Sequence, residues 1–186
     1  MQNERKRFAY ALYCLGPKHL PVSYRMKSAS KIRSWFARRI MASAGKHINI
    51  ERGASFTENT SIGSNSCIGI NCRIQEGKVV IGNNVLMGPD VLIFTTNHES
   101  ARTDIPICMQ GNTESKPVVI EDDVWIGARV IILPGVTVRR GCIVGAGTVL
   151  TKTFPEYSVI AGNPGKVVKN RLDNEKNELE IRKQEE

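Results

Sequence analysis

The chain has 186 residues, of which 41% are hydrophobic and only 6% aromatic, and it contains 16 glycines. This length and composition predict one folded domain, exclude disorder throughout the chain, and leave no apolar run of about 18 residues for a membrane-spanning helix. The formal net charge of +8 is concentrated in residues 1–45, which hold ten Lys/Arg and one acidic residue.

The N-terminal segment, residues 1–47, is basic and is predicted to be helical. Ile32, Trp35, Phe36 and Ile40 recur at helical spacing within residues 29–42, which predicts an amphipathic helix whose apolar side covers one end of the core. A solvated basic face and peripheral contact with an anionic membrane stay open as further roles of the segment. Residues 1–28 are expected to be dispensable for folding.

Targeting and redox signals favour a cytoplasmic protein, with the inner membrane surface as a place of contact. The apolar residues 8–15 follow a basic cluster but lack a small-residue cleavage site, so secretion is not expected. The five cysteines are scattered and form neither a CxxC pair nor a Cys/His metal pattern, which predicts reduced thiols.

Aliphatic residues recur at intervals of six between residues 50 and 150. A slip at residues 76–78 and a longer break divide them into three series: Ile50, Phe56, Ile62, Ile68 and Ile74; Ile81, Met87 and Ile93; Ile120, Ile126, Ile132, Val138, Val144 and Leu150. A period of six predicts a parallel β-helix in which each hexapeptide gives one short strand and one turn. The 14 hexads make between four and five triangular coils.

Four further motifs lie within or just after the repeat. They are Ile-Glu-Asp-Asp-Val-Trp-Ile-Gly at 120–127, Pro-Gly-Val at 134–136, Gly-Ala-Gly at 145–147 and Ala-Gly-Asn-Pro at 161–164. Together with the hexads they resemble the hexapeptide-repeat acyltransferases, and among these the sugar O-acetyltransferases, over residues 48–171. The resemblance implies a left-handed β-helix, a homotrimer with active sites at subunit interfaces, and acetyl-CoA as donor without a metal. The handedness rests on the resemblance alone, because ordinary crossovers are right-handed.

The chain divides accordingly into three parts. These are the N-terminal segment 1–47, a β-helix domain 48–171, and a polar tail or short helix at 172–186. Residues 94–119 interrupt the hexads, and a loop of this length is usually functional. By analogy with the family, we expect it to protrude as an arm that reaches a neighbouring subunit.

His98 is the candidate catalytic residue. It opens the long loop, and its position matches the histidine that the family uses as a general base, whereas His19 and His47 read as structural or surface residues. A neutral imidazole, with a pKa of about 6.5, suits the removal of a proton from a sugar hydroxyl group. Because no Ser or Cys nucleophile motif is present, we expect direct transfer in a ternary complex.

Three residues are candidates for the acceptor pocket. Asn71 matches an asparagine that lines this pocket in the family, and Asp90 stands where relatives often have asparagine. A carboxylate or carbonyl should orient the ring of His98. Glu99 and Asp90 are both candidates for this role, and the sequence does not choose between them.

Further residues match positions that bind the donor in the family. The main chain at Ala128 and Ala146 corresponds to pantetheine contacts, and Trp125 lies beside the same groove. Thr151 and Lys152 match the pair at the nucleotide end. Because CoA carries phosphate groups, Lys166, Lys169 and Arg171 are expected to supply positive charge there.

The sequence therefore predicts an acetyl-CoA-dependent O-acetyltransferase that acts on a sugar or an exopolysaccharide precursor. An N-acetyltransferase of an amino sugar, an antibiotic acetyltransferase and a non-catalytic scaffold remain alternatives. A zinc enzyme of the carbonic-anhydrase type is not expected, because the hexads offer only His98 as a ligand. Nucleic acid is not an expected partner.

Overall fold

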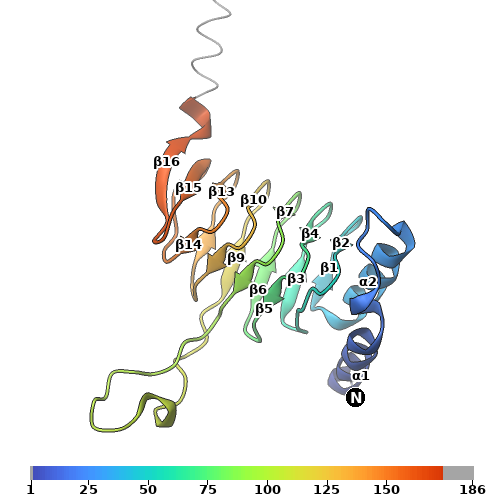
Figure 1. The fold of residues 1–186 in the computed structure, drawn as a ribbon, viewed down its shortest axis with the longest axis horizontal. Helices are drawn as coiled ribbons and strands as arrows, with labels where there is room; N and C mark the ends of the chain where they lie inside the picture. Colours follow the sequence, from blue (N-terminus) through green and yellow to red (C-terminus); the bar gives the residue numbers. More distant parts are fainter. Residues whose placement is uncertain (1, 174–186) are drawn as a thin grey trace, which may run out of the picture.

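The computed structural model describes residues 2–173, and it shows two helices at one end of a prism-shaped solenoid from which an arm projects (Figure 1). The helices are α1 (Gln2–Leu15) and α2 (Lys27–Ile40), joined through the short 3₁₀-helix η1 (Pro17–His19). A second 3₁₀-helix, η2 (Ile107–Met109), lies within the arm.

The strands of the solenoid form three faces. The first face contains β1 (Ser43–Ala44), β3 (Thr60–Ile62), β6 (Val79–Ile81), β9 (Val118–Ile120) and β12 (Thr137–Val138). The second contains β2 (Asn49–Ile50), β4 (Cys67–Ile68), β7 (Leu86–Met87), β10 (Trp125–Ile126), β13 (Ile143–Val144) and β15 (Ser158–Ala161), with β16 (Lys166–Asn170) added antiparallel at its end. The third contains β5 (Arg73–Ile74), β8 (Leu92–Ile93), β11 (Ile131–Ile132) and β14 (Val149–Leu150).

The solenoid is longer than the hexads alone predict. Strand β1 already pairs with β3 ahead of Ile50, and β15 pairs with β13 beyond Leu150. The structure therefore has about six turns rather than the expected four to five. Its first strand starts at Ser43, and the arm occupies residues 94–117 because β9 begins at Val118.

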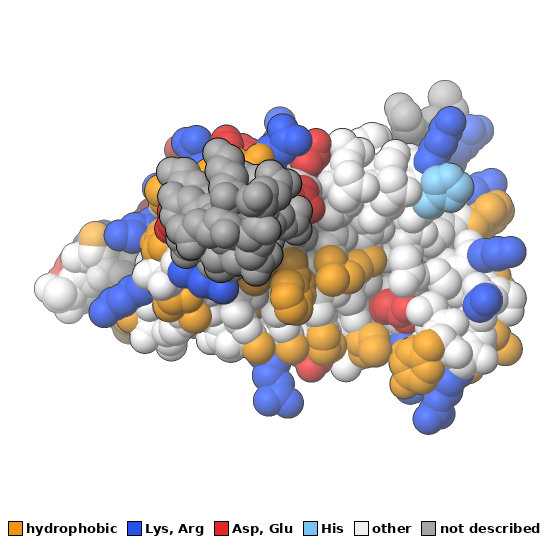
Figure 2. Space-filling model, turned by 90° about the horizontal axis from the view of Figure 1, so that it is seen from above, with side chains coloured by type: hydrophobic (Ala, Val, Ile, Leu, Met, Phe, Trp, Pro, Cys, Tyr) orange, Lys and Arg blue, Asp and Glu red, His pale blue; other side chains and the backbone are white. Residues whose placement is uncertain are grey.

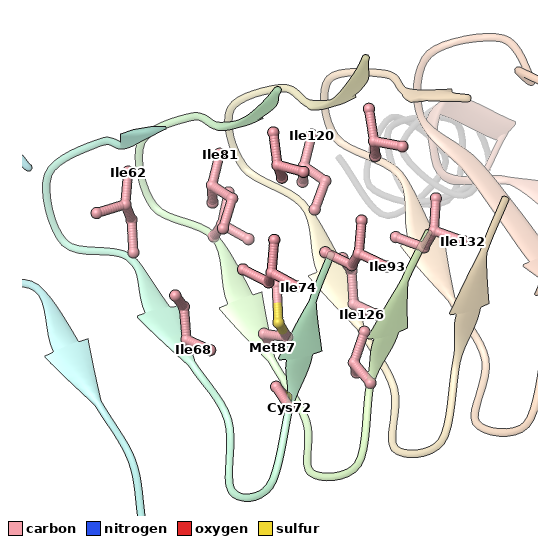
Figure 3. Close-up of a cluster of buried hydrophobic side chains, with 14 of the residues drawn as sticks. Ile62, Ile68, Cys72, Ile74, Ile81, Met87, Ile93, Ile120, Ile126 and Ile132 are labelled. Carbon is pink, nitrogen blue, oxygen red and sulfur yellow. The ribbon is translucent and has the colours of Figure 1, made fainter. Parts of the chain in front are cut away.

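The core is a stack of the residues that recur every six positions. All 14 of them are at most 5% exposed, and Figure 3 shows many of them pointing into the space between the faces. The nine small or β-branched residues found four positions later are also buried: Ser66, Cys72, Val85, Val91, Val124, Val130, Val136, Cys142 and Thr148. Each large apolar side chain contributes about 1.5–3 kcal/mol on burial, so the repeat itself supplies the core.

Most turns between faces, though not those at 57–59, 75–78 and 151–153, place one residue in the left-handed backbone region, directly before the inward residue. Asn71 has a φ of 56° and Asp90 a φ of 58°. Asn and Asp tolerate this region because their short side chains bond locally. The amide of Asn71 donates to the carboxylate of Asp90 one coil further on, at 3.3 Å. The corners of the prism are thus lined by stacked turn residues.

Helix α2 covers the first coil with only part of the face that the sequence predicts, because Ile40 is buried and Phe36 packs against the core but the other two residues do not. Ile32 and Trp35 are 42% and 49% exposed, whereas Arg33 is fully buried. The side chain of Arg33 donates to the carbonyl oxygen of Ile50 at 2.6 Å and to those of Leu20 and Pro21. The helix is rotated because the open end of a solenoid presents unpaired backbone oxygens, which a guanidinium group satisfies and an aliphatic side chain does not.

Helix α1 belongs to the core, so the expectation that residues 1–28 are dispensable is wrong. Tyr13 is fully buried, packs against Phe56 with ring centroids 5.1 Å apart, and donates its hydroxyl hydrogen to the carbonyl oxygen of Ala54. Removal of α1 would take Tyr10 and Tyr13 away from Phe56, which is fully buried beneath them.

The C-terminal end of the described chain turns helical at residues 171–173. Most of the predicted tail at 172–186 lies outside the described residues. Neither α1 nor α2, the two α-helices that the described range contains, has the length and apolar character needed to cross a membrane.

Candidate active site

Two corners of the prism carry the candidate residues. The Asn71 edge, between the second and third faces, comprises residues 51–54, 69–72, 88–91, 127–130 and 145–148. The arm edge, between the third and first faces, comprises residues 57–59, 75–78, 94–117, 133–136 and 151–153. Backbone hydrogen bonds stack the turns of the Asn71 edge directly on one another, as from Asn71 to Arg52 and from Gly147 to Ala128.

His98 lies at the neck of the arm. It pairs with Asn112 in an isolated antiparallel bridge, and its flanking residues are held by hydrogen bonds across the neck: Asn97 O accepts from Thr113 N at 2.8 Å, and Glu99 N donates to Gly111 O at 3.0 Å. The side chain of His98 is exposed. The imidazole is therefore presented to solvent from a backbone that is fixed on both sides.

The base of the arm is anchored to the coil beneath it. Gln75 accepts hydrogen bonds through its side-chain oxygen from the backbone N–H groups of Thr95, at 2.7 Å, and Thr96, at 3.1 Å. The buried hydroxyl oxygen of Thr95 accepts in turn from Gly77 N. These contacts set the direction in which the arm leaves the solenoid, and the sequence gave no signal for Gln75.

The acceptor candidates do not meet His98 within one chain. Asn71 and Asp90 bond to each other on the Asn71 edge, across the third face from the arm. Glu99 follows His98 on the arm itself. Within residues 2–173, no hydrogen bond joins the ring of His98 to either carboxylate, so the two predicted orienting residues remain predictions.

Two donor candidates share the Asn71 edge. Ala146 is an exposed turn residue, and Ala128 lies one coil before it. A Cβ atom on Gly127 would stand 2.6 Å from the backbone nitrogen of Ala146. The glycine at this position is therefore required by the close stacking of the coils.

Three other donor candidates lie elsewhere. Thr151 and Lys152 are exposed on the arm edge directly after β14, and the ammonium group of Lys152 lies 5.6 Å from the ring centroid of Phe154. Trp125 is 51% exposed and points outward from the second face, between Leu86 and Ile143. Within one chain, the residues predicted to bind the pantetheine and those predicted to bind the nucleotide therefore lie on different corners of the prism.

The C-terminal cations do not form one cluster. Lys166 and Lys169 are exposed on β16, where they pair with Ala161 and Val159. Arg171 instead donates to the carbonyl oxygen of Gly141 at 2.6 Å and to the carboxylate of Asp123 at 3.2 Å. Its guanidinium group is thus engaged within the protein, and its contact with a phosphate stays a prediction.

The three thiols of the solenoid, Cys67, Cys72 and Cys142, offer no alternative nucleophile, whereas Cys108 is exposed on the arm. Burial raises the pKa of the Cys72 thiol to about 12, and burial also raises the pKa of Cys67 and of Cys142. A thiol that stays protonated at neutral pH is a poor nucleophile. No cluster of three or more metal-ligating side chains occurs within the part of the chain that is described.

A groove of about 590 Å³ runs beside the Asn71 edge at the helical end of the solenoid. It contains Asn71 and Asp90, which the sequence analysis selected, and also Lys18, Arg52 and Arg73, which it did not. The missed signal lies in the repeat, because Arg73 occupies an outward position of β5 where the equivalent positions on β8 and β11 hold Leu92 and Ile131.

Comparison with known proteins places the chain among enzymes of this architecture. A family model described as the hexapeptide repeat of succinyl-transferase matches residues 117–152. The chain is 33% identical to the galactoside O-acetyltransferase of Escherichia coli K12 over 147 residues, which are 77% of this chain and 71% of that protein. Two yeast relatives, at 36% and 37% identity, are spanned over only 55% and 64% of their own length.

Solved structures agree with the fold. A maltose O-acetyltransferase from Clostridium difficile 630 has a TM-score of 0.71 at 31% identity, covering 91% of this chain and 87% of that one. A hexapeptide-repeat acetyltransferase from Vibrio cholerae O1 biovar eltor, solved with acetyl-coenzyme A, has a TM-score of 0.67 at 27% identity, covering 75% and 76%. These neighbours are left-handed β-helices, and the solenoid described above shares that fold.

Proposed function

Because the chain belongs to the hexapeptide-repeat acyltransferases, we propose that it transfers an acetyl group from acetyl-CoA to a hydroxyl group of a sugar or of an exopolysaccharide precursor. Two relatives that support this proposal are named as O-acetyltransferases of galactosides and of maltose. A third was solved with acetyl-coenzyme A.

The observation that carries the proposal is the presentation of His98. Its imidazole is exposed on a neck whose backbone is fixed by hydrogen bonds on both sides. A neutral ring nitrogen accepts the proton of the acceptor hydroxyl group while the oxygen attacks the thioester carbonyl carbon. The C–S bond then breaks, and the proton passes from the imidazolium to the CoA thiolate. Backbone N–H groups of the neighbouring coils are the proposed donors to the oxyanion.

The site is completed by a second copy of the chain. His98, Thr151 and Lys152 lie on the arm edge, whereas Asn71, Ala128 and Ala146 lie on the Asn71 edge. A cyclic trimer brings the arm edge of one chain against the Asn71 edge of the next. Exposed apolar side chains on the arm, 57% for Ile107 and 73% for Met109, support its docking on a neighbour.

The acetyl donor lies between two chains, where the arm edge of one faces the Asn71 edge of the next. The half-buried turn at Ala128 and the exposed turn at Ala146 receive the pantetheine, and Trp125 borders this space on the second face. Lys152, Lys166 and Lys169 supply positive charge for the phosphates at the C-terminal end. Arg171 is left out of this set because Asp123 and Gly141 already engage it.

We also propose that the enzyme acts in the cytoplasm and contacts the inner membrane surface through α1. Phe8, Leu12 and Leu15 recur at helical spacing along α1 and are 66%, 41% and 82% exposed. Basic side chains accompany them in this helix, as at Arg5 and Arg7. An exposed apolar stripe with neighbouring cations suits the interface of an anionic membrane.

Replacement of His98 tests the proposal. His98→Ala is expected to lower kcat for the best sugar acceptor by about 10²–10⁴, because removal of a general base typically costs this much. The affinity for acetyl-CoA and the melting temperature are expected to stay unchanged, since His98 is exposed and, among residues 2–173 of one chain, no contact joins it to a donor candidate. Thiol release from acetyl-CoA in the presence of a sugar panel measures the rate, and calorimetry measures donor binding.

Glu114→Ala, an exposed change on the same arm, is the matched control. A His98→Ala enzyme that keeps more than about a tenth of the rate would show that another group is the base. A variant that instead loses donor binding and melts early would assign His98 a structural role.

A further inference from the structure

The groove beside the Asn71 edge is formed by two parts of the chain that the fold brings together. One wall is the solenoid, where Asn71 and Asp90 stack at the corner and Arg73 projects outward from β5. The other wall is η1, which is held to the solenoid because Gly53 N donates to Lys18 O at 2.9 Å. The groove therefore includes the proposed acceptor residue Asn71 and a segment that lies outside the repeat.

Positive charge dominates this groove. Lys18, Arg52 and Arg73 line it, and Asp90 is its one lining carboxylate among residues 2–173. The oxygen of Asp90 already accepts from the amide of Asn71. No ion pair within the described range neutralises the three cations, and Lys18 donates only to the hydroxyl oxygen of Ser55, at 2.7 Å. Figure 2 shows that basic side chains also surround the helical end of the molecule, on the right.

The fold does not require these charges. Arg52 and Arg73 are exposed, and the backbone of Arg52, not its side chain, makes the contact that stacks Asn71. The neighbouring outward position on β8 is filled by Leu92, so an apolar residue is compatible with this row. Among residues 2–173, neither guanidinium group has an ion-pair partner. Two such groups at one groove are suited to bind an anion.

The proposed donor does not account for them either. Lys152 follows β14, whereas Arg73 lies on β5, and β8 and β11 separate the two strands. Three strand spacings along the axis amount to about 14 Å. Lys152, one of the cations proposed for the phosphates of CoA, thus stands at the opposite end of the third face from the groove.

We propose that the acceptor carries a negative group, a phosphate or a carboxylate on the saccharide, which Arg52 and Arg73 bind while Asn71 contacts the neutral sugar. This assignment rests on the proposed function, because it treats the groove as the acceptor side of the site. Guanidinium groups bind phosphate and carboxylate alike through paired hydrogen bonds, so both forms of the acceptor fit the same chemistry.

Calorimetry on the whole chain tests the proposal without acetyl transfer. The probes are glucose, galactose, mannose and N-acetylglucosamine, each as the neutral sugar and as its 1-phosphate, together with glucuronate, galacturonate and inorganic phosphate. At least one charged sugar is expected to bind tenfold or more tightly than its neutral counterpart. Arg52→Gln and Arg73→Gln are each expected to weaken that binding by about 10- to 100-fold, as the loss of a charge-assisted hydrogen bond predicts.

Arg139→Gln, an exposed arginine on the other side of the prism, is the matched control and is expected to bind as the wild type does. Arg73→Lys keeps the positive charge but loses the paired N–H donors of the guanidinium group. It is therefore expected to bind the charged sugar more tightly than Arg73→Gln does, but less tightly than the wild type. Increasing salt is expected to weaken binding of the charged probes and leave the neutral ones unchanged.

The outcomes separate this inference from the proposed function. Equal affinity for every charged and neutral pair, indifference to both arginine variants, or binding of inorganic phosphate as tight as that of any sugar phosphate would overturn the inference. If neutral sugars are acetylated regardless of the arginines, the proposed function holds and the anionic acceptor is wrong. If charged sugars bind through the arginines but none is acetylated, the binding site holds and the proposed function is wrong.

Discussion

The glycines of the turns show how single atoms set the spacing of the coils. A Cβ atom on Gly63 would stand 2.5 Å from the carbonyl carbon of Gly82, and one on Gly88 would stand 2.8 Å from the nitrogen of Ala128. Real Cβ atoms do not approach other atoms so closely, and the obstacle is backbone that cannot rotate away. At these positions glycine lets neighbouring coils hydrogen-bond at normal strand spacing.

Gly127→Ala is therefore expected to destabilise the protein. Its Cβ atom would meet the backbone nitrogen of Ala146 at 2.6 Å, and overpacking of this kind costs about 1–3 kcal/mol. Gly145→Ala is the matched control, because the same atom on Gly145 would lie at 3.4 Å from its nearest neighbour, an ordinary contact. Denaturant unfolding of the two variants compares them, and equal stability would contradict the steric account.

At the scale of elements, the cap at the helical end is held by one buried arginine. Arg33 on α2 bonds to three carbonyl oxygens and lies 3.5 Å from the carboxylate of Glu51. The helical spacing of Ile32 and Trp35 predicted the existence of α2 but not its rotation. The hydrophobic pattern shows which side chains are apolar. It does not show that the surface beneath the helix presents backbone carbonyl oxygens, which need a hydrogen-bond donor.

Replacement of Arg33 is expected to loosen the cap. Arg33→Met keeps most of the side-chain volume but leaves buried oxygens and Glu51 without their partner, a loss of about 3–5 kcal/mol. Arg25→Met, on an exposed residue of the same segment, is expected to change stability little. The free energy of unfolding measures both, and a fully stable Arg33→Met protein would show that packing alone holds the cap.

Glu51 gives the same cap a dependence on pH. Burial alone would raise the pKa of Glu51, but hydrogen bonds from Ser23 and Asn49 and the charge of Arg33 outweigh it, so the pKa is lowered. A lowered folded-state pKa adds stability that is complete above the unfolded value of about 4.3 and is lost as the pH falls through the folded value.

Glu51→Gln is thus expected to be less stable than the wild type at pH 7, and the difference should shrink as the pH falls below about 4. Thermal unfolding between pH 3 and pH 7 follows the difference. Glu156→Gln, which changes an exposed carboxylate, should track the wild type throughout. A constant gap between Glu51→Gln and wild type at all pH values would exclude the ionised carboxylate as its cause.

For the whole molecule, periodicity predicted the fold better than it predicted the site. Every position of the three hexad series is buried because inward residues are a property of each repeat unit. The placement of His98 on one corner and Asn71 on another depends on where each hexad falls around the prism. The engagement of Arg171 and the charges beside Asn71 depend on contacts between distant segments, which no local pattern records.

The most direct test of the central claim, that each active site joins the arm edge of one chain to the Asn71 edge of the next, is complementation between two inactive variants. His98→Ala removes the base from the arm edge, and Ala146→Trp blocks the donor on the Asn71 edge with an exposed substitution. The two chains are co-expressed with different tags and purified together. Light scattering first checks for a mass near 61.8 kDa, three times the 20.6 kDa of one chain.

If neighbouring chains share each site, every mixed trimer contains one site with both native edges, which is about a third of its sites. Acetyl transfer by the purified mixed trimers is therefore expected to recover to about a third of the wild-type rate, while each variant alone stays inactive. A mixed trimer as inactive as its parents would mean that His98 and Ala146 act within the same chain, and that result would contradict the account.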